Sequence, residues 1–336
     1  MTNQLTVSEQ SLSRQAFFAN PKNKAIAALL FAAVVISFVP ILVKFAENEI
    51  SPKAIIFHRL WIAGAILGLG QAFMRKRSEL LPEQPSPVNP YSSRQIGLLL
   101  LTGVFFAAQQ ILWAFSVTQT SLANSSLLHN FTPLFVAVIG FLLFGQRFDR
   151  KFILGMIIAI SGSVILGLDD LLYGTSKVLG DGIALISALF FAIYLILVER
   201  VRHHLDAVTT VFYLCIIGTL AILPIICTSK DCIFPSSWGG WLAVVGLAWT
   251  VVLGFCSTLY ALKWLSSGFV AMVLLIEPIL TGIFAWVIFS ERLDLYNLLA
   301  FPTVMLGIYL ATTSELTAKV DTPLSLDTEI LKTSQP

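Results

Sequence analysis

Charged residues are scarce in this chain. Asp, Glu, Lys and Arg make up 12% of its 336 residues, whereas hydrophobic residues make up 57%. An ordinary soluble domain contains about 25% charged residues, and a chain of this length has too small a core to bury so much apolar side chain. The composition therefore excludes a soluble globular protein and predicts an all-α protein that crosses a lipid bilayer many times.

Features typical of enzymes and metal sites are also missing. None of the four cysteines has CxxC spacing, so the sequence predicts neither a zinc site nor a disulfide framework. The HExxH and GxGD patterns of intramembrane proteases are absent. A net charge of +2 is too small to indicate a nucleic acid as partner. These absences disfavour an enzyme, and they exclude no class of transporter.

Ten apolar runs are long enough to form tilted transmembrane helices. Polar or turn-forming segments such as ENEISPK and GQRFDRK separate them, and no period-2 alternation suggests a β-barrel. Polar tails at 1–24 and 314–336 flank them, and the first shows no cleavable signal peptide. We expect spans near 25–43, 54–74, 95–117, 121–144, 152–168, 180–199, 207–227, 238–262, 267–289 and 294–313.

The distribution of Lys and Arg predicts how the chain is oriented. Most of these residues fall on tails and loops that share one side with the N-terminus, including the RKR sequence at 75–77. Positive charge is enriched on cytoplasmic loops. We therefore expect both termini in the cytoplasm, and we expect the protein in the plasma (inner) membrane.

The two halves of the chain echo each other at an offset of 145 residues. Pro133 falls on Pro278, and Arg147 falls on Arg292. Each half contains five expected spans, and an odd number of spans makes the halves run in opposite directions across the membrane. The sequence thus predicts ten transmembrane helices arranged as two inverted five-helix repeats, 25–168 and 180–313. This is the architecture of alternating-access transporters, whose sites lie near the bilayer midplane.

Two segments carry a resemblance to a known family. The second half reads YALKWLSSGFVAMVLLIEPILTGIFAWVIFSERL, and the first contains FVPILVKFAENEISPKAIIFHRLWIAGAIL. Over roughly residues 25–313 the chain resembles the EamA-type transporters of the drug/metabolite transporter superfamily. The resemblance implies export of small organic solutes, often in exchange for protons, with no bound cofactor. One departure is Gly145-Gln146, where the family often has Gly-Glu, whereas the second half keeps Ser290-Glu291.

An acid inside an expected span is the first candidate for the solute site. Glu277 lies next to Pro278, at a depth where a charge costs roughly 2.5–3.5 kcal/mol. Proline interrupts the hydrogen bonds of the helix, and an interrupted helix at this depth faces protein or a watery cavity. Glu277 is then either a proton or cation partner, or a carboxylate bound to Arg59 or to a serine for packing alone.

Other polar and aromatic side chains within the spans are further candidates. His129 and Asn130 precede Pro133 by one turn, where they either bind a proton and a ligand or form interhelical hydrogen bonds. Arg59 either binds a solute carboxylate or pairs with a protein acid. The remaining candidates would form a polar and aromatic wall for a flat solute. They are Gln109, Gln110, Trp113, Tyr194, Trp249 and Tyr260.

The leading hypothesis is a secondary exporter of amino-acid-like or aromatic solutes. Its partners would be the small-molecule solute, the lipid bilayer and, in the functional interpretation of Glu277, a proton. Few basic residues lie inside the spans, which argues against phosphorylated solutes, and a nucleotide-sugar or sugar-phosphate exchanger is the alternative within the superfamily. A channel is disfavoured because no span has a continuous polar stripe. A sensor is disfavoured because no soluble domain is present, and an intramembrane enzyme because its motifs are missing.

Overall fold

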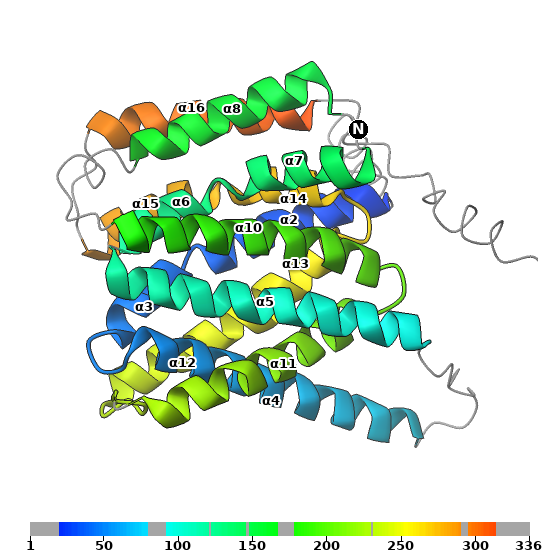
Figure 1. Cartoon of the computed structure of the whole chain (residues 1–336), viewed down its shortest axis with the longest axis vertical. Coiled ribbons are helices and arrows are strands. Elements are labelled where there is room, and N and C mark those ends of the chain that lie inside the picture. The colour runs from blue at the N-terminus through cyan, green and yellow to red at the C-terminus, as the bar shows by residue number, and fades with distance from the viewer. Residues whose placement is uncertain are drawn as a thin grey trace, which may run out of the picture.

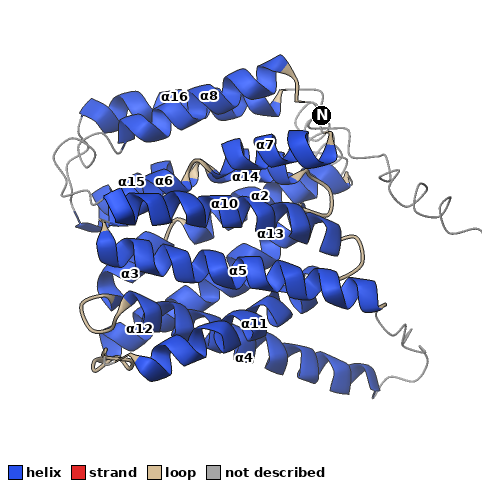
Figure 2. Ribbon diagram, in the orientation of Figure 1, coloured by secondary structure: helices blue, strands red, loops and turns tan. Residues whose placement is uncertain are grey.

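The computed structural model describes residues 20–79, 92–120, 122–145, 148–166, 178–229, 231–289 and 295–313. Within these ranges the chain forms helices joined by turns and short loops (Figure 2). The helices lie side by side in one bundle, and the first helix begins at the same end of the bundle where the last helix ends (Figure 1). The expected class, an all-helical protein that crosses a membrane many times, is confirmed.

The helices follow the expected order of apolar runs. The first half of the chain contains α2 (Pro21–Ile36), α3 (Val39–Ala46), α4 (Pro52–Glu79), α5 (Ser93–Gln119), α6 (Leu122–His129), α7 (Thr132–Phe144) and α8 (Arg150–Leu166). The second half contains α10 (Val178–Val201), α11 (Ala207–Thr228), α12 (Trp238–Trp249), the π-helix η1 (Thr250–Phe255), α13 (Cys256–Ala261), α14 (Ser267–Leu274), α15 (Glu277–Phe289) and α16 (Leu295–Thr312).

Eight helical segments in the described ranges are long and apolar enough to cross a membrane. The other two expected spans correspond to α8 and α16, and neither is among the eight. α8 has 17 residues, which makes it about 26 Å long and shorter than the roughly 30 Å hydrocarbon core. Within α16 the apolar stretch is Leu299–Ala311. Helix length and composition therefore confirm a multi-pass protein but not the count of ten spans.

Three of the expected spans are interrupted inside the bundle. The breaks fall at residues 37–38 between α2 and α3, at 130–131 between α6 and α7, and at 275–276 between α14 and α15. The last two breaks are related by the same offset of 145 residues as the sequence echo. Proline lacks an N–H and has a fixed φ, so it suits the first turn of a new helix. A proline is the second residue of the second helix at each break: Pro40, Pro133 and Pro278.

The bundle contains two groups of helices. In the first group α10 packs against α5, α6 and α7; in the second group α2 and α3 pack against α12, η1, α13, α14 and α15. These contacts follow the repeat. The sixth expected span packs against the third and fourth, and its counterpart, the first, packs against the eighth and ninth. The remaining helices form two pairs, α4 with α11 and α8 with α16.

The two groups are joined at one end of the bundle. There α14 packs against α7 and against α10, at the end where the described chain begins and finishes (Figure 1). The backbone N–H of Ser267, at the start of α14, donates a 2.8 Å hydrogen bond to Glu199 of α10. On the other side of the breaks, the described parts of α6 and α15 do not pack against each other to a comparable extent. The contact between the groups is therefore concentrated on the side of the termini.

Candidate functional site

A chain of aromatic rings connects the two helix groups. Phe255 of η1 contacts Phe106 of α5, with 5.8 Å between ring centroids, and Phe106 lies 5.3 Å from Tyr194 of α10. Tyr194 stacks on Phe191 at 5.6 Å, and Phe191 lies 5.0 Å from the ring of His129, the last residue of α6. We call these five residues the ring cluster. It brings two predicted site residues, Tyr194 and His129, into one assembly.

Arg59 lies at one end of the ring cluster. Its guanidinium carbon is 5.6 Å from the centroid of Phe255, and the side chain is only 7% exposed. Glu277, the first residue of α15, is close enough to Arg59 for the two charges to attract each other. Among the described residues, however, no carboxylate oxygen lies within 4.0 Å of the guanidinium nitrogens, so Arg59 forms no direct ion pair there. The structure thus places the two predicted charges near each other without a direct contact.

Several polar atoms around the ring cluster are buried without a hydrogen-bond partner. They are Nε of Arg59, Oε1 of Gln109, Nδ1 of His129 and the hydroxyl of Tyr194. Tyr194 is 1% exposed and Gln109 is 6% exposed, so water does not satisfy these groups from the surface. Buried polar groups in native proteins nearly always have a partner. Their concentration here makes the ring cluster the candidate functional site.

The predicted polar strip lies on α5, a helix of the first group. The backbone carbonyl of Gln109 accepts a 3.0 Å hydrogen bond from the buried hydroxyl of Ser187, which joins α5 to α10. Gln110 is buried, and Trp113 is partly buried against the main hydrophobic core. Asn130 lies in the turn between α6 and α7, where its backbone N–H continues the α6 hydrogen bonds. Gln109 is the residue of this set with an unpartnered side-chain atom.

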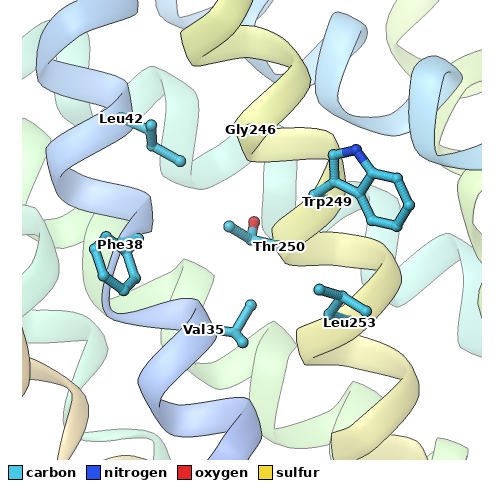
Figure 3. Close-up of a pocket in the computed structure, with 7 residues that line it drawn as sticks. All are labelled: Val35, Phe38, Leu42, Gly246, Trp249, Thr250 and Leu253. Atoms are coloured by element: carbon cyan, nitrogen blue, oxygen red, sulfur yellow. The ribbon is translucent and has the colours of Figure 1, made fainter.

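Trp249 and Tyr260 lie away from the ring cluster contacts. Trp249 is 45% exposed and lines an open apolar groove of about 230 Å³ between α2–α3 and α12–η1. Tyr260 is 37% exposed on α13. Their expected contact with the solute stays a prediction. Figure 3 shows the groove and its lining residues, which are Val35, Phe38, Leu42, Gly246, Trp249, Thr250 and Leu253.

The ring cluster contains three phenylalanines that sequence reasoning did not select. With 25 phenylalanines in the chain, residue type alone singles out none of them. A helical-spacing signal was present, because Phe191 precedes Tyr194 by three residues and Phe106 precedes Gln109 by three. Side chains three apart share a helix face. Phe255 has no such neighbour among the predicted residues, and only the fold brings it to Phe106.

His58, beside Arg59, has a complete set of hydrogen bonds. The indole Nε1 of Trp61 donates to His58 Nδ1 at 2.9 Å, so Nδ1 acts as the acceptor. The proton then lies on Nε2, which is 2.9 Å from the carbonyl of Ile233 and donates to it. This histidine fastens α4 to the loop before α12. Gln146 and Glu291, where the two halves depart from each other, lie outside the described residues.

Several known proteins similar to this chain are named as transporters. The sequence model of the EamA-like transporter family matches residues 23–168 and again residues 178–313. An uncharacterized transporter of Archaeoglobus fulgidus is 24% identical, over 82% of this chain and 92% of its own length. The pseudopaline exporter CntI of Pseudomonas aeruginosa is 24% identical, over 79% of this chain and 87% of its own.

The fold has a counterpart among solved structures. A crystal structure of a protein that is 17% identical superposes with a TM-score of 0.69, over 87% of this chain and 98% of that one. The family match extends over almost the whole helical region and occurs twice, once in each half. The chain therefore belongs to the EamA-like transporter family and is an integral membrane transporter, as the resemblance in its sequence predicts.

Proposed function

We propose that the protein is a secondary active exporter of small organic solutes that works by alternating access. The observation that carries this proposal is the pair of helix groups, which pack together at one end and enclose the ring cluster, Arg59 and Glu277. Alternating access requires a site between two bodies that close on one side at a time. The similarity to a protein named as an exporter supports export as the direction.

We propose further that α8 and α16 complete ten spans, in two inverted repeats covering 25–168 and 180–313. The matching breaks at 130–131 and 275–276 support this arrangement. The symmetric exchange of helix contacts between the halves supports it as well. Because α8 and α16 pack on each other, each can lie across a locally thinned bilayer although α8 alone is short.

The joined end of the bundle is, in this proposal, the cytoplasmic end of a plasma-membrane protein. Most Lys and Arg residues fall on loops and tails of that side in the ten-span arrangement, and positive loops stay in the cytoplasm. The packing of α7, α14 and α10 at that end supports our assignment of the structure to an outward-facing state. The inward-facing state would separate α14 from α7 and bring α6 toward α15.

Glu277 is the residue that we propose as the proton-coupling group. It begins α15 directly at the break. The positive charge of Arg59 lies nearby, but the two groups form no direct ion pair. Ionisable groups at membrane depth are commonly functional. A carboxylate that is near a cation without being bound to it can exchange a proton as the site opens to either side.

Efflux from proteoliposomes tests the function. Purified protein is reconstituted in vesicles loaded with a panel of amino acids and aromatic acids, and efflux is followed with and without an imposed pH gradient. Glu277→Gln is expected to abolish acceleration by the gradient, because glutamine carries no titratable proton. Glu47→Gln is the matched control, since it makes the same change on an exposed residue after α3. Gradient-driven efflux that survives Glu277→Gln would show that this carboxylate does not couple transport to protons.

A further inference from the structure

The unpartnered polar atoms are concentrated at the ring cluster. Of the six buried side-chain atoms without a hydrogen-bond partner in the described residues, four belong to Arg59, Gln109, His129 and Tyr194. Leaving such a group unpaired costs free energy, because the group gives up its hydrogen bonds to water without replacing them. Four of them around one set of ring contacts are therefore a cost that a bound molecule would remove.

The polar atoms differ in character between the two ends of the ring cluster. At the Phe255 end, Arg59 offers a charged donor. At the other end, Tyr194 offers a hydroxyl and His129 a ring nitrogen. Between the ends lie the faces and edges of phenylalanine rings. The site is thus cationic at one end, polar at the other, and apolar between them.

At the charged end, the atom that lacks a hydrogen-bond partner belongs to Arg59. Nε of Arg59 is buried without a partner, whereas the oxygens of Glu277 are not among the unpartnered buried atoms. Glu277 is also partly exposed. A ligand atom that satisfies this end must accept hydrogen bonds from a guanidinium, and a carboxylate does so with matched geometry.

We propose that the ring cluster binds organic carboxylates, with the carboxylate on Arg59, an apolar ring packed against Phe255 and Phe106, and a polar group near Tyr194 and His129. This inference rests on the proposed function, because it names the class of solute that the exporter carries. It assigns Arg59 as the anchoring residue and Tyr194 as a residue that selects solutes with a distal hydroxyl group.

Binding to the purified full-length protein tests the proposal with a set of matched probes. 4-Hydroxyphenylacetate, its neutral amide and the amine tyramine share one ring and differ in the group that would meet Arg59. The acid is expected to bind at least about tenfold more tightly than the amide, because a charged hydrogen bond is stronger than a neutral one. Equal or tighter binding of the amide or of tyramine would overturn the assignment of the carboxylate to Arg59.

Variants of Arg59 and Glu277 are expected to differ in their affinity for the acid, which separates the proposal from a general loss of folding. Arg59→Gln should weaken the acid by about tenfold or more and leave the amide unchanged. Glu277→Gln removes the nearby negative charge, so it should bind the acid at least as tightly as the parent protein. Unchanged acid affinity in Arg59→Gln, or loss of acid binding in a folded Glu277→Gln, would contradict the proposal.

The distal end is tested by removing one oxygen atom. Tyr194→Phe keeps the ring and deletes the hydroxyl, so it should reduce the preference for 4-hydroxyphenylacetate over phenylacetate. An unchanged preference would overturn the role of Tyr194. Binding without efflux of the same acid from liposomes would refute the proposed transport while leaving the site intact. Efflux of other solutes without binding of the acid would refute only the solute class.

Discussion

Thr281 on α15 donates a hydrogen bond from Oγ1 to the backbone carbonyl of Ser37, over 2.9 Å. Ser37 lies at the break between α2 and α3, so this bond ties the ninth expected span to the interruption in the first. Next to it, the rings of Phe38 and Phe284 stack with their centroids 4.5 Å apart. The joint holds the second helix group together close to the residue that begins α15, Glu277.

Removing the Thr281 hydroxyl is expected to loosen this joint. Thr281→Val keeps the shape of the side chain but leaves the Ser37 carbonyl without this donor, and interhelical hydrogen bonds in membranes are worth about 0.6 kcal/mol on average. We expect a small loss of unfolding free energy in detergent. Thr303→Val is the control, because the Thr303 hydroxyl bonds within its own helix to Leu299. An equal loss in both variants would show that the bond to Ser37 contributes nothing specific.

We expect the Glu49 carboxylate to stabilise the bundle near neutral pH and to lose this contribution in acid. It accepts hydrogen bonds from the backbone N–H groups of Ser236 and Ser237, at 2.8 and 2.9 Å, and from both hydroxyls. These bonds, led by those of Ser237, lower the pKa of the Glu49 carboxyl from 4.5 to about 2. A lowered folded-state pKa stabilises the fold above pH 4.5, and the contribution disappears as the pH falls toward 2.

The test compares thermal unfolding of the parent protein and Glu49→Gln from about pH 6 to about pH 3. The midpoint of Glu49→Gln should lie below that of the parent at the higher pH, and the difference should shrink toward the lower pH. Lys53→Gln is a useful comparison, because the 3.6 Å ion pair of Lys53 with Asp231 joins the start of α4 to the same loop before α12. A difference in unfolding midpoint that stays constant across the pH range would mean that the negative charge of Glu49 does not stabilise the fold.

Close packing of α8 on α16 depends on glycine. A Cβ at Gly155 would lie 2.5 Å from the carbonyl oxygen of Gly307 and 2.6 Å from the backbone nitrogen of Ala311. Gly155→Ala should therefore push the two helices apart and cost about 1–3 kcal/mol. Gly70→Ala on α4 meets nothing within 4 Å, and it should be neutral or stabilise by roughly 0.5–1 kcal/mol. Unfolding in detergent measures both, and a stable Gly155→Ala would argue that α8 and α16 separate easily.

The contact between α7 and α14 should form and break during each transport cycle if transport uses alternating access. A Cβ at Gly268 would lie 3.9 Å from Cγ1 of Val136, so cysteines at these two positions are within reach of each other. The double variant, in a background where the exposed Cys227 and Cys232 are serine, should lose efflux on oxidation and recover it on reduction. Each single cysteine should be insensitive to oxidation. Full efflux with complete cross-linking would exclude separation of α7 from α14 during transport.

Local sequence features predicted the elements of the fold well. Apolar runs marked every described helix, because a chain in lipid must satisfy its backbone hydrogen bonds within each helix. Pro133 and Pro278 marked two breaks, because the effect of a proline on its own helix is local. The breaks themselves fall two or three residues before these prolines. The membrane class and the transporter family, both predicted from sequence, are confirmed.

The membership of the site was harder to predict than its elements. The prediction grouped Trp249 and Tyr260 with Tyr194. The structure places Trp249 at an open groove, Phe106 against Tyr194 and Phe255 against Phe106. Aromatic side chains are common on all the spans, and helical spacing shows which residues share a face but not what that face meets. The pairing of faces depends on how the helices rotate and pack, which involves side chains from both halves.

The sequence by itself determined that this chain is a bundle of lipid-embedded helices with related halves, because hydropathy and proline act on neighbouring residues. Only the tertiary structure decided that Arg59 and Glu277 approach without pairing, that the helix groups join on one side, and which polar atoms remain unsatisfied. Those relationships come from contacts between residues far apart in the chain. The free energy of such contacts depends on the packing of the whole bundle rather than on any single segment.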